Sequence, residues 1–338
     1  MSDASDLTVP LTRGEATTAM RGMLSGERTA AEIKKFLVAY NAREASAAEL
    51  SGFLDAVRSA ATPIVLAPNL AARAIDLVGT GGDNSSSVNV STMAAFVVAG
   101  AGVPVCKHGN RSASSKCGTA DVLEALGATI DLSAARVARC VERVGFGFVF
   151  APAFHPAFKH VGPIRRELGV PTVFNLLGPM ANPAPVGLML VGVADPRRMK
   201  VMANVLAART SRAWVVHGHG GLDELSLAGP NRVVVAEHGE VKDEIVLDAR
   251  TLGFAPAENE QLRGGDPAHN ANVVRAVLSG EMHGAIRDVV VLNAAAALTV
   301  AGRVSDLSAG VTLAIDAISS GAARTTLEAF VAETTLIS

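Results

Sequence analysis

Apolar residues follow a helical period through the first sixty positions of the chain. Between positions 11 and 61 they recur at spacings of three and four, as Phe36 and Leu37 do after Ile33, and this spacing is typical of one buried helix face. A residue suited to an N-cap precedes each of the three periodic segments: Thr12, Thr29 and Ser46. The pattern predicts three short helices that form a small helical domain.

The pattern changes beyond a linker predicted over 61–73, which contains Pro63 and Pro68. Short apolar runs then alternate with helical segments. The candidate strands are 75–78, 103–107, 147–150, 188–193 and 213–217. Such alternation favours a parallel sheet with right-handed crossovers and helices on both faces. We therefore expect an α/β protein with a helical domain over 1–70, joined by part of 151–185, and an α/β domain over 71–338.

Two segments depart from the alternation. Residues 151–185 indicate one helix over 156–168 and then a proline-rich stretch, which is expected to leave the sheet and pack on the first domain. After Pro230 the alternating pattern predicts an antiparallel hairpin that turns near His238 and Gly239. The remainder, from Asp266 onward, has a helical pattern.

Composition narrows the class of protein. Hydrophobic residues make up 49% of the 338 residues and aromatic residues only 4%, which suits an aliphatic core under a parallel sheet. The 30 basic and 32 acidic residues give a net charge of −2 without a basic block, so we expect no nucleic acid partner. Two long stretches without charged residues follow Asp83 and Gly169. Glycines and prolines interrupt both stretches, which excludes these stretches as membrane spans. Three cysteines without metal-binding spacing are typical of a cytoplasmic protein.

The first candidate site is the GTGGD turn at 79–83, which follows the strand at 75–78. Asn89, Ser91 and Thr92 then open an apolar helix. Backbone amides at such a turn and at a helix start can bind an anion together. The turn lacks the Gly-Lys-Ser or Gly-Lys-Thr of the nucleotide P-loop. A turn shaped only by backbone geometry is the alternative, and the hydroxyl-rich helix start favours a phosphate ligand.

The second candidate is the loop KHGNRSASSKCG at 107–118. It leaves the same carboxyl edge of the sheet as the glycine turn, and open α/β folds bind ligands at this edge. Lys107, Asn110 and the serines could oppose an anionic substrate, although loop charges are usually solvated.

The third candidate is the adjacent pair Asp223 and Glu224 in a glycine-rich loop. Carboxylate oxygens suit magnesium, which often also binds substrate phosphates. Arg165, in HVGPIRRELG, is from its pattern alone a salt-bridged helix arginine.

Several motifs, in order and over nearly the whole chain, resemble those of the anthranilate phosphoribosyltransferase family. They are GTGGD, VNVST, KHGNR, SSKCGTADVLEALG, HPAFKHVGPIRRELGVPTVFNLLGPMANP and GLDELS. The resemblance implies a helical domain joined to a larger α/β domain and a homodimer formed through the helical domains. It also implies magnesium, two ions per subunit, and transfer of a phosphoribosyl group from phosphoribosyl pyrophosphate to anthranilate.

The resemblance also assigns residues to ligands. Phosphoribosyl pyrophosphate would contact Gly79, Gly82, Asp83, Ser87, Asn89, Val90, Ser91, Thr92, Lys107, His108, Gly109, Asn110, Arg111, Ser112, Ala113, Ser114, Ser115 and Thr119. Anthranilate would contact Gly79, Asn110 and Arg165, and magnesium would be held by Ser91, Asp223 and Glu224.

Cys117, Thr119 and the segment 84–87 depart from the family pattern, so the shape of the diphosphate pocket is the open point. Two other functions stay open on these residues. A pyrimidine nucleoside phosphorylase of related fold would not need the Asp223–Glu224 pair, and a non-catalytic sensor would bind a ribose phosphate without turnover.

Overall fold

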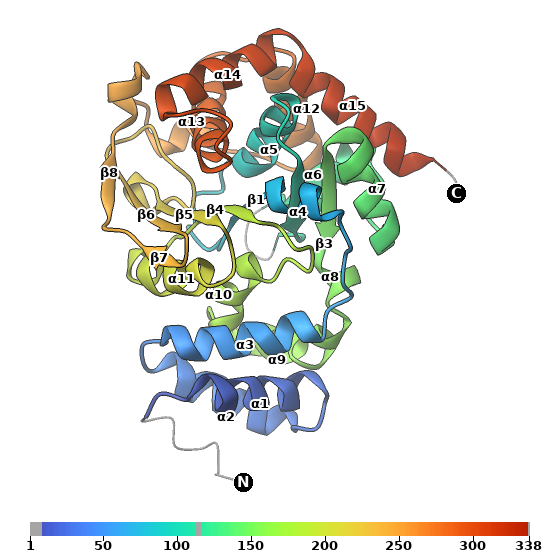
Figure 1. The fold of residues 1–338 in the computed structure, drawn as a ribbon, viewed down its shortest axis with the longest axis vertical. Helices are drawn as coiled ribbons and strands as arrows, with labels where there is room; N and C mark the ends of the chain where they lie inside the picture. The colour runs from blue at the N-terminus through green and yellow to red at the C-terminus, as the bar shows by residue number, and fades with distance from the viewer. Residues whose placement is uncertain (1–8, 113–115, 337–338) are drawn as a thin grey trace.

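The computed structural model describes residues 9–112 and 116–336. The predicted phosphate-contacting residues Ala113, Ser114 and Ser115 lie outside the described residues. Figure 1 shows a layer of helices formed by the first part of the chain, a central sheet, and a second group of helices on the far side of that sheet.

The first three helices begin at the predicted caps. They are α1 (Arg13–Leu24), α2 (Ala30–Asn41) and α3 (Ala47–Ser59). Each cap side chain accepts a hydrogen bond from the backbone of a glutamate three residues later, and that glutamate accepts one from the cap in return. This reciprocal arrangement satisfies two free N–H groups at each helix start. The prediction of three capped helices is confirmed.

The segment between strands β3 (Phe146–Phe150) and β4 (Leu188–Gly192) returns to this helical layer. It contains α8 (Ala151–Phe154), the 3-10 helix η1 (Pro156–His160), α9 (Gly162–Leu168) and α10 (Val173–Met180). Helix α9 packs on α2, and α10 packs on α2 and α3, as Figure 1 shows for α10 between α3 and the sheet.

Two predictions about proline-containing segments are wrong. The single helix over 156–168 is broken, because Pro156 and Pro163 lack a backbone N–H and each occupies the start of a new helical element. The stretch that follows is helical in α10. The linker over 61–73 ends in the short helix α4 (Pro68–Arg73), again with proline near its start.

The central sheet has eight strands in the described part of the chain. They are β1 (Ile75–Gly79), β2 (Val105–Gly109), β3 (Phe146–Phe150), β4 (Leu188–Gly192), β5 (Arg212–His217), β6 (Asn231–Glu237), β7 (Glu240–Val241) and β8 (Ile245–Leu247). Strands β3-β2-β1-β4-β5 run parallel in that order, and β6 joins β5 antiparallel with β7 and β8 beside it. The parallel sheet and the hairpin turn at His238 and Gly239, both at positive φ, are confirmed.

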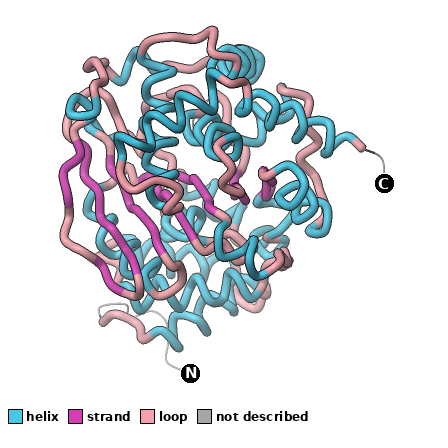
Figure 2. Tube along the Cα trace, turned by 45° about the horizontal axis from the view of Figure 1, so that its top comes forward, coloured by secondary structure: helices cyan, strands magenta, loops and turns pink. Residues whose placement is uncertain are grey.

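Helices cover both faces of this sheet. The remaining α-helices are α5 (Val90–Gly100), α6 (Thr119–Ala125), α7 (Ala134–Val144), α11 (Met199–Ala207), α12 (Pro267–Leu278), α13 (Ala285–Val300), α14 (Leu307–Ser319) and α15 (Ala322–Thr335). Short 3-10 helices are η2 (Pro196–Arg198), η3 (His219–Gly221), η4 (Ala249–Leu252) and η5 (Asn259–Leu262). Helix α5 contacts β1, β2 and β3 and is surrounded by α12, α13, α14 and α15. Figure 2 shows the strands running between these helical layers.

Strand register brings the candidate loops together. Gly79 of β1 is opposite Gly192 of β4, which is opposite Val216 of β5. The loops after β1, β4 and β5 therefore leave the sheet at the same level. Among the described residues, no helix has both the length and the apolar composition needed to cross a bilayer.

Candidate active site

The glycine turn after β1 is anchored to its neighbours by backbone contacts. The Thr80 amide donates to the Gly192 carbonyl oxygen at 3.0 Å, and the Thr80 hydroxyl accepts from the Ala194 amide at 3.1 Å. Gly81 and Gly82 have φ values of 65° and 77°, which L side chains rarely adopt. The Gly81 amide donates to Asp223 Oδ2 at 2.7 Å. The turn therefore directs an amide at a carboxylate from the loop after β5.

Glycines at three strand ends make room for the Asp223–Glu224 backbone. A Cβ on Gly79 would lie 2.2 Å from Asp223 Oδ2, and one on Gly192 would lie 1.6 Å from the Asp223 carbonyl oxygen. A Cβ on Gly218 would lie 2.1 Å from the Glu224 carbonyl oxygen. The acidic pair is thus fitted against strand ends that can carry no side chain.

Two buried asparagines hold the loop that follows the acidic pair. Asn293 Oδ1 accepts from the Leu225 amide, and its Nδ2 donates to the Leu225 carbonyl, both at 2.9 Å. Asn231 holds Ser226 in the same way, at 2.7 and 3.0 Å. Sequence reasoning missed both asparagines and Gly192, because no local spacing marks a contact with a residue so distant in the chain.

Lys107 lies beneath the site rather than in a solvated loop. It is 1% exposed, and its Nζ donates to Ser91 Oγ at 3.1 Å and to the Leu77 carbonyl oxygen. The Ser91 amide, at the start of α5, donates to Glu224 Oε1 at 3.1 Å. Ser91, Lys107 and Glu224 therefore come together as the site prediction requires, and the solvated alternative for Lys107 is wrong.

The acidic pair is held where negative charge is unfavourable. Burial and then the nearby Asp83 carboxylate raise the pKa of Asp223 to about 7. Burial and then the Asp223 charge raise the pKa of Glu224 to about 8, while Lys107 opposes the shift. Burial lowers the pKa of Lys107, against the pull of neighbouring carboxylates. A divalent cation would relieve this repulsion.

The donor atoms at this point suit magnesium. Carboxylate and hydroxyl oxygens are hard ligands, and magnesium is commonly bound through one or two carboxylates, water and substrate phosphates. Asp223, Glu224 and the Ser91 hydroxyl supply such oxygens. No group of three acidic, histidine or cysteine side chains with metal-binding geometry occurs among the described residues.

The raised pKa values predict pH-dependent stability. A carboxyl whose pKa is raised by folding stabilises the folded protein most at pH values below its ordinary pKa. This stabilisation is lost as pH rises to the pKa of the folded state. The metal-free protein should therefore become less stable as pH rises from about 4, near the ordinary pKa of both carboxyls, to about 8, where Asp223 and Glu224 have ionised in the folded state. Magnesium should restore the loss, so its effect on the thermal midpoint should grow over this range. Thermal unfolding with and without magnesium tests this, and an equal magnesium effect at every pH would contradict it.

Buried Asp76 supports the site from β1. Its Oδ1 accepts from the His108 amide at 3.1 Å, and its Oδ2 accepts from Asn182 Nδ2 at 2.9 Å. Burial raises its pKa to about 6, against the opposite effect of Lys107. Sequence reasoning also missed Asp76, because it sits within an apolar strand run.

Residues that follow β2 contact two different helices, α5 and α6. Arg111 pairs with Asp121 at 2.9 Å and Glu124 at 2.5 Å on α6, and the Ser112 amide donates to Asp121 Oδ2 at 3.2 Å. The Thr119 and Thr92 hydroxyls lie 3.4 Å apart. Thr119, the first residue of α6, therefore lies beside Thr92 in the first turn of α5, whereas the Arg111 guanidinium pairs with carboxylates of α6.

Residues 84–87 are supported by a distant segment. The Gly264 amide donates to the Ser86 carbonyl oxygen at 2.9 Å, and Ser87 bridges to Arg263. Asn270 Nδ2 donates to Asn89 Oδ1 at 2.9 Å. Ser86 itself has a φ of 51°. The shape of this predicted diphosphate segment thus depends on residues 262–270.

Arg165 lies apart from the acidic pair, on α9. Its guanidinium stands 5.1 Å from the centre of the Phe174 ring, and burial lowers its pKa. No carboxylate among the described residues forms an ion pair with it, so the salt-bridge alternative for this residue is wrong. A partly buried, unpaired guanidinium beside an aromatic ring suits a planar carboxylate ligand.

Two buried histidines, His108 on β2 and His155 at the end of α8, lie next to each other. The rings of His108 and His155 are 5.2 Å apart, and burial lowers their pKa values to about 3 and about 4. His108 Nδ1 is 3.2 Å from the Gly178 carbonyl oxygen. His108 therefore faces α10 rather than the glycine turn.

Comparison with known proteins covers nearly the whole chain. Residues 8–61 match the helical bundle domain of the glycosyl transferase family, and residues 71–324 match its a/b domain. The anthranilate phosphoribosyltransferase of Roseiflexus castenholzii is 48% identical over 94% of this chain and 93% of its own length. That of a Nocardioides species is 50% identical over 96% and 95%.

Solved structures of similar proteins have the same fold as this chain. The crystal structure of anthranilate phosphoribosyltransferase from Thermus thermophilus superposes with a TM-score of 0.92, at 42% identity over 98% of both chains. The enzyme from Saccharomyces cerevisiae in complex with PRPP and Mg has a TM-score of 0.89, at 28% identity over 96% of this chain and 94% of its own. With its helical and α/β parts both matched, this chain belongs to the anthranilate phosphoribosyltransferase family.

Proposed function

We propose that this chain transfers the phosphoribosyl group of 5-phosphoribosyl 1-pyrophosphate to the amine of anthranilate, in tryptophan biosynthesis. The products are N-(5-phosphoribosyl)anthranilate and pyrophosphate. The observation that carries this proposal is the position of Asp223 and Glu224 against the glycine turn and Ser91. That arrangement joins a metal-binding pair to an anion-binding turn at one edge of the sheet.

The phosphoribosyl pyrophosphate site comprises the glycine turn, the start of α5 and the loop after β2. Its proposed contacts are Gly79, Gly82, Asp83, Ser87, Asn89, Val90, Ser91, Thr92, Thr119 and residues 107–115. The hydrogen bonds linking Ser91, Lys107 and Glu224 support the central part of this assignment. Arg111 is the least supported member, because it would have to leave Asp121 and Glu124 to reach a phosphate.

Magnesium, two ions per subunit, would be held by Ser91, Asp223 and Glu224. When bound, these ions would neutralise charge that develops on the departing pyrophosphate. The yeast relative whose structure contains both PRPP and Mg supports this pairing. Asp223 and Glu224 would contribute by fixing the ion positions, since their backbone is packed on Gly192 and Gly218.

Anthranilate would lie between the glycine turn and α9. Arg165 and Asn110 would orient its carboxylate, and Gly79 would line the approach to the ribose. The free Arg165 guanidinium beside Phe174 supports this role. The yeast relative has also been solved in complex with 4-fluoroanthranilate.

The reaction needs positioning rather than an acid or base on the protein. The amine nitrogen forms a bond to ribose C1, the bond from C1 to the pyrophosphate oxygen breaks, and the amine loses a proton to water. Alignment of the two substrates supplies much of the rate in such a displacement. The amides of the glycine turn and the start of α5 would stabilise negative charge on the leaving group.

We also propose the larger organisation of the molecule. The helical domain would comprise residues 1–70 together with part of 151–185, and the α/β domain would comprise 71–338. The packing of α9 and α10 on α2 and α3 supports the assignment of the returning segment. Two copies would pair through their helical domains.

A fluorescence assay tests the proposed reaction. The protein is mixed with anthranilate, phosphoribosyl pyrophosphate and magnesium, and the loss of anthranilate fluorescence is followed. Loss should require all three components. A folded protein that consumes no anthranilate would refute the proposal, and phosphorolysis of thymidine or uridine would instead support the nucleoside phosphorylase.

Arg165→Ala should chiefly weaken anthranilate use. A charge-assisted hydrogen bond contributes about 1.5–3 kcal/mol, so KM for anthranilate should rise by roughly 10- to 100-fold with little change in KM for phosphoribosyl pyrophosphate. Initial rates with each substrate varied in turn measure the two constants. Arg166→Ala is the matched control, because Arg166 is the adjacent and exposed arginine. If Arg165→Ala weakened only phosphoribosyl pyrophosphate, the proposed division of the site would be wrong.

A further inference from the structure

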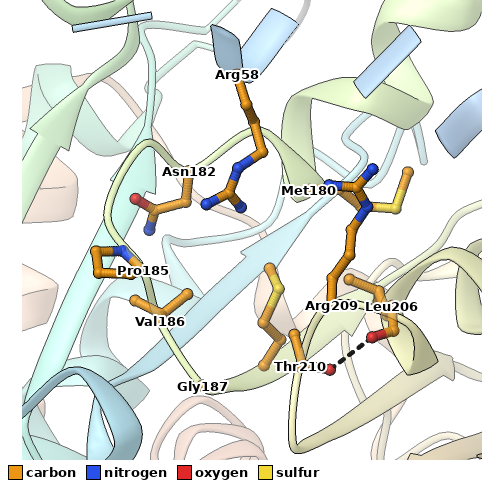
Figure 3. Close-up of a pocket in the computed structure, with 10 residues that line it drawn as sticks. Arg58, Met180, Asn182, Pro185, Val186, Gly187, Leu206, Arg209 and Thr210 are labelled. Carbon is orange, nitrogen blue, oxygen red and sulfur yellow. Dashed lines mark hydrogen bonds between the residues drawn. The ribbon is translucent and has the colours of Figure 1, made fainter. Parts of the chain in front are cut away.

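A cavity of about 180 Å³ lies where the helical layer meets the amino ends of β4 and β5. Arg58 of α3 and Arg209 after α11 both line it, together with Met180, Asn182, Pro185, Val186, Gly187, Met189, Leu206 and Thr210. Figure 3 shows the Arg58 side chain directed toward Asn182, with the Arg209 guanidinium beside Met180.

This cavity is separate from the active site. Gly187, which lines it, immediately precedes β4, whereas Gly192 at the other end of that strand packs against Asp223. At about 3.3 Å per residue, the five-residue strand places the two ends roughly 13 Å apart.

Positive charge at the cavity exceeds negative charge. Arg209 pairs with Asp55 at 2.5 Å and donates to the Ser51 carbonyl oxygen at 3.1 Å, and Arg13 pairs with Asp55 at 2.7 Å. Arg58 forms no ion pair or hydrogen bond through its guanidinium with any described residue. Burial lowers the pKa of Arg58, and the neighbouring Arg209 lowers it further. Three arginines therefore gather around one carboxylate: Asp55 pairs directly with Arg13 and Arg209, and it acts on Arg58 only through its charge.

The other polar groups of the cavity already have partners. Asn182 Nδ2 donates to Asp76 and to the Cys106 carbonyl oxygen, and the Thr210 hydroxyl donates to the Leu206 carbonyl oxygen. The free donors are therefore guanidinium N–H groups, whose forked geometry matches the oxygens of a carboxylate or phosphate. The volume is below the roughly 300–1,000 Å³ of pockets for drug-sized ligands, which favours a small ion over a nucleotide.

We propose that this cavity is a second anion site, which takes a phosphate-type oxyanion between Arg58 and Arg209. The bound ion would link α3 to the segment between α11 and β5, and so join the helical layer to the sheet. Inorganic phosphate and pyrophosphate share the required chemistry. Because the site is separate from the acidic pair, this proposal does not depend on the proposed reaction.

Thermal unfolding without magnesium tests the site, with phosphate and pyrophosphate added in separate arms. The wild-type midpoint should rise by about 2–4 °C at saturation, since binding to the folded state alone stabilises it. Arg58→Gln should lose most of this rise and, without anion, should be at least as stable as the wild type, because an unpaired charge has been removed. The control is Arg324→Gln, which removes the same positive charge from an exposed arginine on α15. It should respond to the anions as the wild type does. A rise in only one arm would identify which ion fits.

A crystal soaked with selenate, an anomalous scatterer that mimics phosphate, locates the ion directly. A peak between Arg58 and Arg209 in the wild type that is absent in Arg58→Gln would establish the site. A peak confined to the glycine turn, or equal midpoint rises in all three proteins, would overturn the proposal. Loss of catalytic activity in either variant is not a readout here, so failure of this proposal is distinguishable from failure of the proposed reaction.

Discussion

Replacing Asp223 with Asn and Glu224 with Gln together should abolish turnover while leaving the protein folded. Both substitutions keep the side-chain shape and remove the charge that binds magnesium. Loss of the metal's electrostatic stabilisation should lower kcat/KM by at least about 10³-fold, because each 1.4 kcal/mol of lost transition-state stabilisation is a factor of ten. Steady-state rates over a magnesium titration, with circular dichroism to verify folding, measure the effect.

The chain contains a matched control for this double variant. Asp243 and Glu244 form a second adjacent acidic pair, exposed between β7 and β8, where Glu244 pairs with Arg232 at 2.6 Å. The substitutions Asp243→Asn with Glu244→Gln remove the same charge from another Asp-Glu sequence. They should leave kcat/KM within about twofold of the wild-type value, since surface ion pairs contribute little. Full activity of the Asp223–Glu224 variant in magnesium would exclude the assigned role.

The variant Asp223→Asn with Glu224→Gln should be more stable than the wild type in metal-free buffer near pH 8. The raised pKa values of Asp223 and Glu224 mean that their ionised forms oppose folding at this pH. A stabilised but inactive protein would separate the catalytic effect from a folding defect. This combination is expected of residues whose burial serves a ligand rather than the fold.

Features encoded in short stretches of sequence were predictable. The caps Thr12, Thr29 and Ser46 act on neighbouring backbone, so local spacing located the first three helices. Strand and helix periodicity also located the parallel sheet, although β2 begins at Val105 rather than at 103, because Pro104 has no N–H to donate to a sheet.

Features that depend on distant contacts were not predictable from spacing. Asn293 is 68 residues from the Leu225 backbone that it holds, and Asn182 is 106 residues from Asp76. Nothing near either asparagine in the chain indicates such a partner. The burial of Lys107 likewise depends on β1 and α5 closing around it, so its charge alone favoured a solvated position.

Gly192→Ala should damage the active site through steric contact alone. Gly192 does not have positive φ, so alanine is compatible with its backbone conformation. Its Cβ, however, would lie 1.6 Å from the Asp223 carbonyl oxygen and 2.4 Å from the carbonyl carbon. Both are backbone atoms that no rotamer change can move, so the loop must shift by about 1.5–2 Å to reach ordinary contact distance.

This shift should move both acidic residues away from Ser91 and the glycine turn. A displacement of about 1 Å in a catalytic group can cost about 10²-fold in rate, so kcat/KM should fall by about 10²-fold or more. The magnesium concentration needed for half-maximal rate should rise as well. Overpacking typically destabilises by about 1–3 kcal/mol, which chemical denaturation would measure.

Gly14→Ala provides the control for Gly192→Ala. Gly14 lies in α1, and an added Cβ there would meet no other atom within 4 Å. The change should leave activity intact and stabilise the helix slightly, because alanine has the higher helix propensity. Unchanged magnesium dependence in a folded Gly192→Ala variant would show that the close packing of the acidic loop is unnecessary. A rise in the magnesium requirement without a comparable effect on anthranilate KM would instead assign Gly192 to positioning Asp223 and Glu224.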